Sequence, residues 1–349
     1  MRIYINSLRK RKKNKKIYLK AFKQSIFSNF ANQIKLQILN IIPFDETIDL
    51  GYSPVMTVGM FDGVHIGHQK LLSILKQKAE KYNTKPIVIT FDKHPQLVIK
   101  PELFDKIRLL QTNEERFEKL NSLGIEDIIT IHFTKEFAKL SAQEFLDLLI
   151  KKYSPKYFLL GYDNHFGNKS SDEFNKLVLE NKKKGLILER TDDCVIYKDI
   201  EVSSTQIRKA LAKGDIGLAN SMLNEEYIIS GEVVHGNKIG KTIGCPTANI
   251  KVEKHKLLPL FGVYLCKVDV NEKGYSGLVN IGWRPTIIDS PVTIEVHILE
   301  FDKEIYGQNI KIKLKEFLRE EIKFENLEQL KHQINLDIEI AHQYFKDNE

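Results

Sequence analysis

The chain is poor in cysteine and contains no long apolar run. Its 349 residues include only three cysteines, Cys194, Cys245 and Cys266, which lie far apart and form no C-x-x-C pair. This odd number and wide spacing predict neither a disulfide framework nor a zinc site, and they are typical of the reducing cytoplasm. No segment approaches the ~18 consecutive apolar residues of a membrane-spanning helix, so we expect no transmembrane segment.

Acidic residues are absent from the first part of the chain. Residues 1–35 carry eleven Lys or Arg and no Asp or Glu, which leaves 53 − 11 = 42 basic against 46 acidic residues in the rest. The net charge of +7 therefore comes from this basic extension, and the body offers no clustered footprint for nucleic acid. We expect residues 1–35 to be a disordered tail or the result of a wrongly chosen start codon. A membrane-surface or RNA tether and a targeting segment are the alternatives, although a secretory signal would need an uninterrupted apolar core.

Composition and length indicate a globular protein with two domains. A hydrophobic content of 42% and a charged content of 28% are ordinary for such a protein, and 349 residues suffice for two cores. Between about residues 50 and 223, strand-like runs alternate with helical patterns, two of which open with capping boxes, Thr112 with Glu115 and Ser141 with Glu144. This alternation predicts a parallel sheet covered by helices. The strand-like runs are VMTVGMF, KPIVITF, DIITIHF, KYFLLGY and GLILER.

The pattern changes after residues 223–227, where we place the domain boundary. Residues 227–349 contain five strand-like runs without helices between them, which predicts a small antiparallel β-barrel or sandwich. A helix with Asn326 as its N-cap is expected at the end of the chain. Its apolar face is predicted to consist of Leu327, Leu330, Ile334 and Ile338.

The first candidate site is the loop VGMFDGVHIGH at residues 58–68. It lies between a predicted strand and a predicted helix, so His65, Gly67 and His68 should stand at the helix N-terminus, where the backbone favours an anion. Glycines let the backbone approach a ligand, and imidazoles can donate hydrogen bonds to charge that develops in a transition state. A glycine-rich turn with surface histidines is the alternative.

Two further segments could complete a nucleotide site. In VSSTQIRKAL, at residues 202–211, serine and threonine hydroxyls and Arg208 could hold a triphosphate, or they could form an ordinary helix cap with a surface arginine. LLGYDNHFG, at residues 159–167, offers polar groups for a nucleotide and an aromatic ring for a flat ligand, or a polar loop that closes on a buried phenylalanine. TFDKHP, at residues 90–95, ends another predicted strand.

From about residue 50 to residue 345, these motifs resemble the prokaryotic bifunctional riboflavin kinase/FMN adenylyltransferase family, the FAD synthetases. The resemblance implies a Rossmann-like nucleotidylyltransferase domain at residues 50–223 and a riboflavin kinase β-barrel with a C-terminal helix at residues 227–349. It implies that His65 and His68 stabilise the α-phosphorus of ATP while the phosphate of FMN displaces pyrophosphate. It also implies that Phe166 contacts the flavin and that ATP is bound by Gly59, Phe61, Asp62, Gly63, Gly67, Asp163, Ser204, Thr205 and Arg208.

The barrel carries an equally specific resemblance. The segment GEVVHGNKIGKTIGCPTANI resembles the riboflavin kinase signature, which implies that Thr247 and Asn249 serve Mg²⁺ and the phosphates and that Gly240 and Gly244 let the backbone approach ATP. Glu295 matches the catalytic base of the family, and Arg319 matches a residue placed near the flavin. Without the resemblance, a strand glutamate such as Glu295 is typical of a solvated outer face, opposite the inward neighbours Ile294 and Val296.

Three positions depart from the pattern of the family. Cys245 stands where phenylalanine is common, Asn164 where an aromatic or histidine is common, and Lys93 where proline is common. The last two leave the flavin contacts of the first domain open. No motif position is missing outright.

The sequence thus predicts two enzymes on one chain, with ATP, riboflavin and FMN as substrates, FMN and FAD as products, and Mg²⁺ accompanying ATP. We expect a cytoplasmic protein in which any homo-oligomer is weak. One rival is another H-x-G-H nucleotidylyltransferase or a class I aminoacyl-tRNA synthetase, but the P-T-A-N half argues against both. The other is a flavin- or RNA-binding regulator without catalysis, for which Glu295 and the two histidines would have no use.

Overall fold

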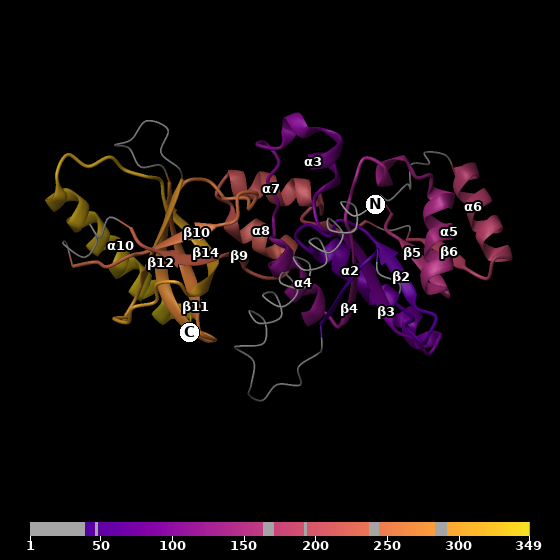
Figure 1. The fold of residues 1–349 in the computed structure, drawn as a ribbon. Coiled ribbons are helices and arrows are strands. Elements are labelled where there is room, and N and C mark those ends of the chain that lie inside the picture. Colours follow the sequence, from indigo (N-terminus) through magenta and orange to yellow (C-terminus); the bar gives the residue numbers. More distant parts are fainter. Residues whose placement is uncertain are drawn as a thin grey trace, which may run out of the picture. The chain divides into compact units, whose positions relative to one another are not determined.

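A parallel sheet of six strands forms the first half of the described chain (Figure 1). The computed structural model describes residues 39–45, 48–162, 171–191, 194–236, 244–282 and 292–348. The sheet has the strand order β1-β4-β3-β2-β5-β6, and every pairing in it is parallel. Its strands are β1 (Asn40–Pro43), β2 (Val55–Val58), β3 (Pro86–Phe91), β4 (Asp127–Ile131), β5 (Tyr157–Leu160) and β6 (Ile187–Arg190).

Helices connect these strands, as the alternating pattern predicts. Both predicted capping boxes are present: Thr112 and Glu115 open α4, and Ser141 and Glu144 open α5. The connecting elements are α2 (Ile66–Lys81), α3 (Pro95–Ile99), η1 (Pro101–Leu103), α4 (Asn113–Ser122), η2 (Phe137–Lys139), α5 (Ala142–Tyr153) and α6 (Ser171–Lys183).

The strand order reverses direction between β2 and β5. From β2 the chain proceeds through β3 to β4 on one side, and it then returns to β5 on the other side of β2. In open α/β sheets, ligands bind outside the carboxyl ends of the strands at such a switch point. The loop with His65 leaves β2 at this place, so the fold puts the first candidate site where a ligand is expected.

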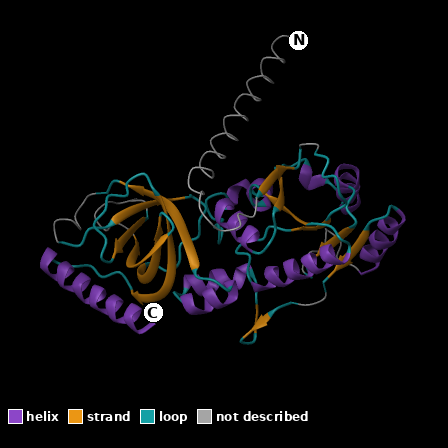
Figure 2. Ribbon diagram, turned by 90° about the horizontal axis from the view of Figure 1, so that it is seen from below, coloured by secondary structure: helices purple, strands orange, loops and turns teal. Residues whose placement is uncertain are grey.

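The second half is a closed antiparallel barrel with the strand order β10-β13-β12-β11-β14-β9. The expected barrel is therefore confirmed, and the sandwich alternative is excluded. Its strands are β9 (Tyr227–Val234), β10 (Ala248–Val252), β11 (Gly262–Val270), β12 (Lys273–Gly282), β13 (Thr293–Ile298) and β14 (Asn309–Arg319). Figure 2 shows the final helix, α10 (Leu327–Asn348), beside the barrel, and it contacts β12.

Two helices join the sheet to the barrel in one hydrophobic core. These are α7 (Ser204–Ala212) and α8 (Ile216–Leu223), which follow the short hairpin of β7 (Ile196–Tyr197) and β8 (Ile200–Glu201). Buried residues of α7 and α8, such as Leu211 and Met222, belong to the same cluster as Tyr264 and Val279 inside the barrel. The end of the first half thus packs directly on the second.

Several details differ from the sequence-based expectations. Strand β1 adds to the sheet ahead of residue 50, and the strands of the sheet are shorter than the apolar runs that predict them. Asn326 does cap α10, because its Oδ1 accepts a hydrogen bond from Gln329 N at 3.0 Å. Leu327, however, is 58% exposed, whereas Ile338 of the predicted face packs against the cluster that contains Ala341 and Phe345. The buried residues of the helix are Asp337, Ala341 and Phe345. Among the described residues, we find no helix both long and apolar enough to cross a membrane.

Candidate active sites

The loop between β2 and α2 is held in a strained conformation by its buried side chains. Phe61 and Val64 have positive φ angles of 51° and 38°, which are uncommon for residues with bulky side chains. Both side chains are buried in the core of the first domain. Gly63 has φ +89°, and a Cβ there would lie 2.7 Å from Leu110 Cδ1. Backbone strain of this kind persists only where the surroundings determine the conformation, and it clusters at functional sites.

His65 and His68 form a stacked pair at the beginning of α2. His65 is the N-cap, and its Nδ1 accepts from His68 N at 3.4 Å. The ring centroids are 3.7 Å apart with an interplanar angle of 19°, and the Phe61 ring lies 5.1 Å from that of His68. A Cβ on Gly67 would lie 3.1 Å from His65 Nδ1, so a larger residue would press on the imidazole. The predicted position of both histidines at the helix N-terminus is confirmed.

Both imidazoles are neutral near pH 7. Burial, together with the positive charge of Arg208, lowers the pKa of His65 to about 4. Burial and the neighbouring His65 ring lower the pKa of His68 well below its ordinary value. Because Nδ1 of His65 accepts a backbone hydrogen bond, the neutral ring carries its proton on Nε2 and can donate it to an anion.

Asp62 is a buried residue of this loop, and its carboxylate holds Arg208. One carboxylate oxygen, Oδ1, accepts from Leu110 N at 2.9 Å and Gln111 N at 3.3 Å. The other, Oδ2, forms a short ion pair with Nη2 of Arg208, on α7. Asp62 is buried, whereas about a third of the Arg208 side chain remains exposed. Asp62 therefore fixes the guanidinium, which keeps an accessible face.

The two serines before Arg208 form hydrogen bonds within the protein. Ser203 is the N-cap of α7, so the cap interpretation is correct for that residue. Ser204 Oγ donates to the carbonyl of Asp62 at 2.8 Å and thus ties α7 to the histidine loop. Thr205 is exposed in the first turn of α7. The structure brings residues 59–68 and 203–208 together although they are about 140 residues apart.

Two residues of this site are not singled out by the sequence, although His94 lies in the segment TFDKHP. Arg116, on α4, is 1% exposed and donates to the carbonyls of Met60 at 3.0 Å and Phe91 at 2.7 Å, where β2 and β3 end. Burial lowers its pKa to about 10, so it remains charged. His94 caps α3, and burial together with Arg208 and Arg116 lowers its pKa. A helix arginine and a histidine before a proline are too common in sequences to be singled out.

On the barrel, strand register aligns Glu295 with two asparagines. Glu295, on β13, lies opposite Asn249 of β10 and, on its other side, opposite Asn280 of β12. Side chains directly opposite in antiparallel strands have Cβ atoms about 4.5–5.5 Å apart. Ile294 and Val296 are buried in the barrel interior, which confirms that Glu295 faces the other side. Asn249, Glu295 and Asn280 thus form a row across three neighbouring strands, in which Asn280 is not singled out by the sequence.

The segment before β10 lies against the same row. Pro246 O contacts Nδ1 of His297 at 2.9 Å, and His297 stands two residues after Glu295 on β13. Thr247 is half-buried, Cys245 is buried, and Gly244 is exposed with φ +83°. A Cβ on Gly236 would lie 2.2 Å from Asn249 Nδ2, so only glycine leaves room for this amide.

The oxygen atoms of this segment suit a magnesium ion. Mg²⁺ is held by few protein oxygens and completes its octahedron with water and substrate phosphates. The Thr247 hydroxyl, the Asn249 carboxamide and the Glu295 carboxylate provide hard oxygen donors in one neighbourhood. The absence of a side chain at Gly236 lets the Asn249 carboxamide keep its place in this neighbourhood.

Arg319 has a structural partner. Its Nε and Nη2 donate to the carboxylate of Asp337 at 2.7–3.1 Å, and Asp337 is a buried residue of α10. This bidentate ion pair ties the last barrel strand to the final helix. Three predicted contacts, Asp163, Phe166 and Gly240, lie outside the described residues, as does Asn164.

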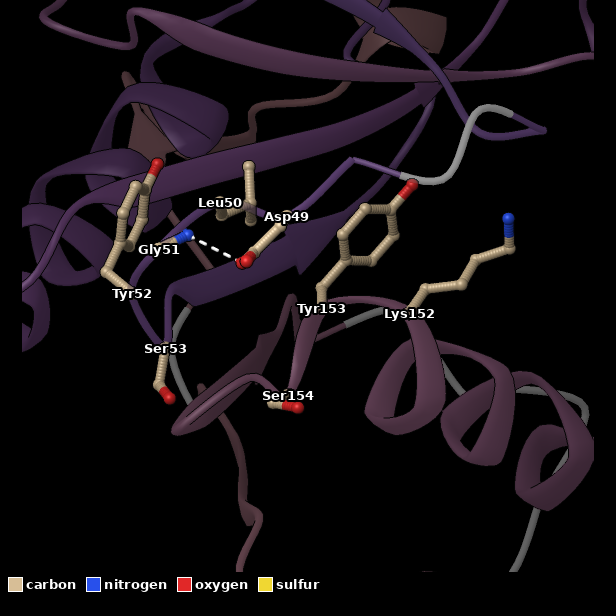
Figure 3. Close-up of a pocket in the computed structure, with 8 residues that line it drawn as sticks. All are labelled: Asp49, Leu50, Gly51, Tyr52, Ser53, Lys152, Tyr153 and Ser154. Carbon is tan, nitrogen blue, oxygen red and sulfur yellow. Dashed lines mark hydrogen bonds between the residues drawn. The ribbon is translucent and has the colours of Figure 1, made fainter.

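An open pocket of about 280 Å³ lies away from both candidate sites. It is lined by residues 49–53, which precede β2, and by Lys152, Tyr153 and Ser154, which precede β5 (Figure 3). The pocket is therefore at the amino ends of the strands, whereas His65 and His68 follow the carboxyl end of β2. We assign it no part in the chemistry.

Two family models match different parts of the chain. A riboflavin kinase family model matches residues 223–345, and an FAD synthetase family model matches residues 50–206. The bifunctional riboflavin kinase/FMN adenylyltransferase of Listeria monocytogenes is 35% identical over 87% of this chain and 96% of its own. The protein of that name from Escherichia coli K12 is 36% identical over 83% and 92%.

A solved structure is similar over the same range. A crystal structure described as a macrolide-efflux protein from Streptococcus pneumoniae matches with a TM-score of 0.76 and 32% identity. The match covers 86% of this chain and 98% of that one. Both halves of the fold therefore occur together in a solved relative.

Proposed function

This chain belongs to the bifunctional riboflavin kinase/FMN adenylyltransferase family, and on that premise we propose how its residues carry out the two reactions. The barrel phosphorylates riboflavin to FMN with ATP, and the α/β domain adenylylates FMN with ATP to give FAD and pyrophosphate. The observation that carries the proposal is the pair His65 and His68 at the head of α2, with Arg208 fixed nearby by Asp62.

For adenylyl transfer, a phosphate oxygen of FMN attacks the α-phosphorus of ATP and pyrophosphate leaves. We assign His65 and His68 as hydrogen-bond donors to the charge that develops there, in a buried site where such donors are most effective. Arg208 neutralises the triphosphate. Ser204, Thr205, Asp163 and the backbone at Gly59, Gly63 and Gly67 are proposed to contact ATP, and Phe166 to contact the flavin.

Phe61 and Asp62 take indirect roles in this scheme. Because both are buried residues of the loop, we propose that their side chains shape the ATP site from inside the protein instead of touching the nucleotide. Phe61 supports the His68 ring, and Asp62 orients Arg208.

For riboflavin phosphorylation, Glu295 accepts the proton of the ribityl 5′-hydroxyl as that oxygen attacks the γ-phosphorus of ATP and ADP leaves. Thr247 and Asn249 would hold Mg²⁺, which neutralises phosphate charge when bound. Gly240 and Gly244 let the backbone approach ATP, and Arg319 contacts the flavin while Asp337 holds its guanidinium.

We also propose the substrates, the cellular compartment and the oligomeric state of the enzyme. Its substrates are ATP, riboflavin and FMN, and no nucleic acid is required by the body of the chain. All three cysteines are unpaired, which suits a reducing cytoplasm. Any homo-oligomer is expected to be weak.

One incubation tests the assignment. Purified protein is mixed with riboflavin, ATP and Mg²⁺, and the flavins are separated chromatographically. Formation of FMN followed by FAD is expected. FMN alone would remove the assignment of the α/β domain, and no conversion of riboflavin would remove that of the barrel.

A further inference from the structure

We propose that Lys256, a residue of the barrel, is a positioning residue for adenylyl transfer in the other domain. The inference rests on the function proposed above for Arg208. Its basis is the segment Arg108–Gln111, which leads into α4 and whose backbone contacts the adenylyl-transfer site and the barrel at once.

One set of contacts of this segment fixes the arginine. The carbonyl of Arg108 accepts from Nε of Arg208 at 3.2 Å. Leu110 N and Gln111 N donate to Asp62, which in turn holds Nη2 of Arg208. The contacts of the guanidinium with Arg108 and with Asp62 therefore both depend, directly or through Asp62, on where this segment lies.

Another set of contacts reaches the loop between β10 and β11. Leu109 N donates to His255 O at 2.7 Å, and Leu257 N donates to Leu109 O at 2.7 Å. Between these two bonds, Nζ of Lys256 donates to Leu110 O at 2.7 Å. The segment is thus paired with the barrel loop as a short parallel bridge.

The Lys256 ammonium is buried and has partners on both sides of the contact. Its side chain is fully buried, and Nζ lies 2.6 Å from Glu115 Oε2 and 4.5 Å from the centre of the Tyr227 ring. The other oxygen of Glu115 accepts from Ser230 N, on β9, at 3.0 Å. A buried charge is tolerated when it is paired and fully hydrogen-bonded, so this arrangement holds one geometry between the barrel, α4 and the segment.

Lys256 therefore acts on Arg208 indirectly, through the segment Arg108–Gln111. Loss of its ammonium frees Leu110 O and leaves Glu115 without its cation, so the segment that orients Asp62 and Arg208 can shift. Displacements of about 1 Å in a positioning group can cost ~10²-fold in rate. Nζ contacts Leu110, Glu115 and the Tyr227 ring, which have no role in the proposed kinase site, so the rate of riboflavin phosphorylation should not change.

The test is Lys256→Met in the full-length protein, which keeps most of the side-chain volume and removes the charge. With FMN, ATP and Mg²⁺ supplied, kcat for FAD formation should fall about 10- to 100-fold, while the rate of FMN formation from riboflavin stays within about twofold. An unchanged kcat for FAD formation would overturn the proposal. If wild-type protein itself made no FAD from FMN, the proposed function would fail instead.

Lys311→Met is the matched control. Lys311, on β14, forms an ion pair with Glu118 of α4, so it too joins the barrel to this helix, but the pair is partly exposed and connects the two elements directly instead of through Arg108–Gln111. It should leave FAD formation within about twofold. An equal loss in both variants would mean that any weakening of the contact between the halves has this effect, and Lys256 would have no special role.

A double-mutant cycle separates positioning from general stability. If Lys256 acts through Arg208, then Lys256→Met should cost much less in an Arg208→Lys background than alone, because residues in one network are not additive. Additive losses would contradict the proposal. The variant Lys256→Met/Glu115→Gln removes both buried charges and should show the same selective loss; loss of both activities in this variant as well would reduce the pair to a purely structural element.

Discussion

The adenylyl-transfer site and the kinase site are positioned by different kinds of contact. At the head of α2, Asp62, Arg116 and Arg208 come from distant parts of the chain and are tied together by hydrogen bonds to backbone groups and by the ion pair between Asp62 and Arg208. On the barrel, Asn249, Glu295 and Asn280 are neighbours because three adjacent strands pair in one register. The first site can therefore be damaged from outside its motifs, whereas the second should respond mainly to changes in its own side chains.

The largest effect is expected from Glu295→Gln, which preserves shape and removes proton acceptance. Proton transfer by a positioned carboxylate contributes ~10²–10⁴ in rate, so FMN formation from riboflavin should fall by about that factor. FMN supplied directly should still become FAD at the normal rate, as chromatography of the flavins will reveal.

Glu232→Gln provides the control for this change. Glu232 is an exposed glutamate on β9 of the same barrel and should have no effect on either rate. Near-normal phosphorylation by Glu295→Gln would mean that another residue is the base or that the reaction needs none. Loss of FAD formation from FMN would show that the two sites are not separate.

His68→Ala tests the other side of the comparison. Removing one donor to the transferring phosphate should lower FAD formation from FMN by about 10²–10³, as for other lost oxyanion donors. Riboflavin phosphorylation should persist, and His342→Ala, an exposed change on α10, should affect neither rate. Equal loss of both activities would argue for one shared ATP site.

The sequence allows most of the fold to be predicted, because its periods are clear. Alternating helices and strands, the two capping boxes and the barrel strands β9, β11, β12, β13 and β14 all follow from local patterns, whereas β10 is not predicted as a strand. Strand β1 is not predictable in this way: its NIIP is short, and it becomes a strand by pairing with β4. The exposed Leu327 is also a tertiary effect, since periodicity cannot indicate where a long helix leaves the surface on which it packs.

The candidate sites are predictable only where their residues belong to motifs. His65 and His68 are visible as H-x-G-H before a helix, and their position at its N-terminus is confirmed. The ion pair between Asp62 and Arg208 is not visible, because 146 positions separate the two residues. Arg116 and Lys256 are missed for the same reason: both are ordinary cations in the sequence and acquire their roles through burial.

A smaller effect should appear in stability at low pH. The pKa of His65 in the folded protein, about 4, lies below its ordinary value of 6.5, so the unfolded chain takes up the proton first as the pH falls. The effect of His65 on stability is absent above about pH 6.5. As the pH falls from 6.5 to 4, it progressively lowers the free energy of unfolding, by about 2 kcal/mol at pH 5. Among the described residues, the row formed by Asn249, Glu295 and Asn280 contains no comparable buried imidazole. This loss of stability at low pH is therefore specific to the adenylyl-transfer site.

Urea unfolding at pH 7.5 and pH 5 will measure this effect. The loss of stability on acidification should be about 2 kcal/mol smaller in His65→Gln than in the wild type. His342→Gln, on the exposed side of α10, should lose as much as the wild type. An identical pH dependence in His65→Gln and wild type would mean that His65 is not the group that titrates.

The smallest effect is expected from deleting residues 1–35, and a longer deletion makes the comparison sharper. Neither proposed site uses a residue before Gly59, so both rates should stay within about a few-fold of wild type. Deletion of residues 1–48 also removes β1, the edge strand of the sheet. Asn40 of this strand donates to Asp127 of β4 at 2.8 Å, and the buried Phe44 follows the strand directly. That deletion should lower the stability of the α/β half and its FAD formation, while riboflavin phosphorylation by the barrel continues. If the shorter deletion already abolished one activity, the basic extension would be part of that site. Distant hydrogen bonds and strand register would then not be sufficient to explain how the two sites are positioned.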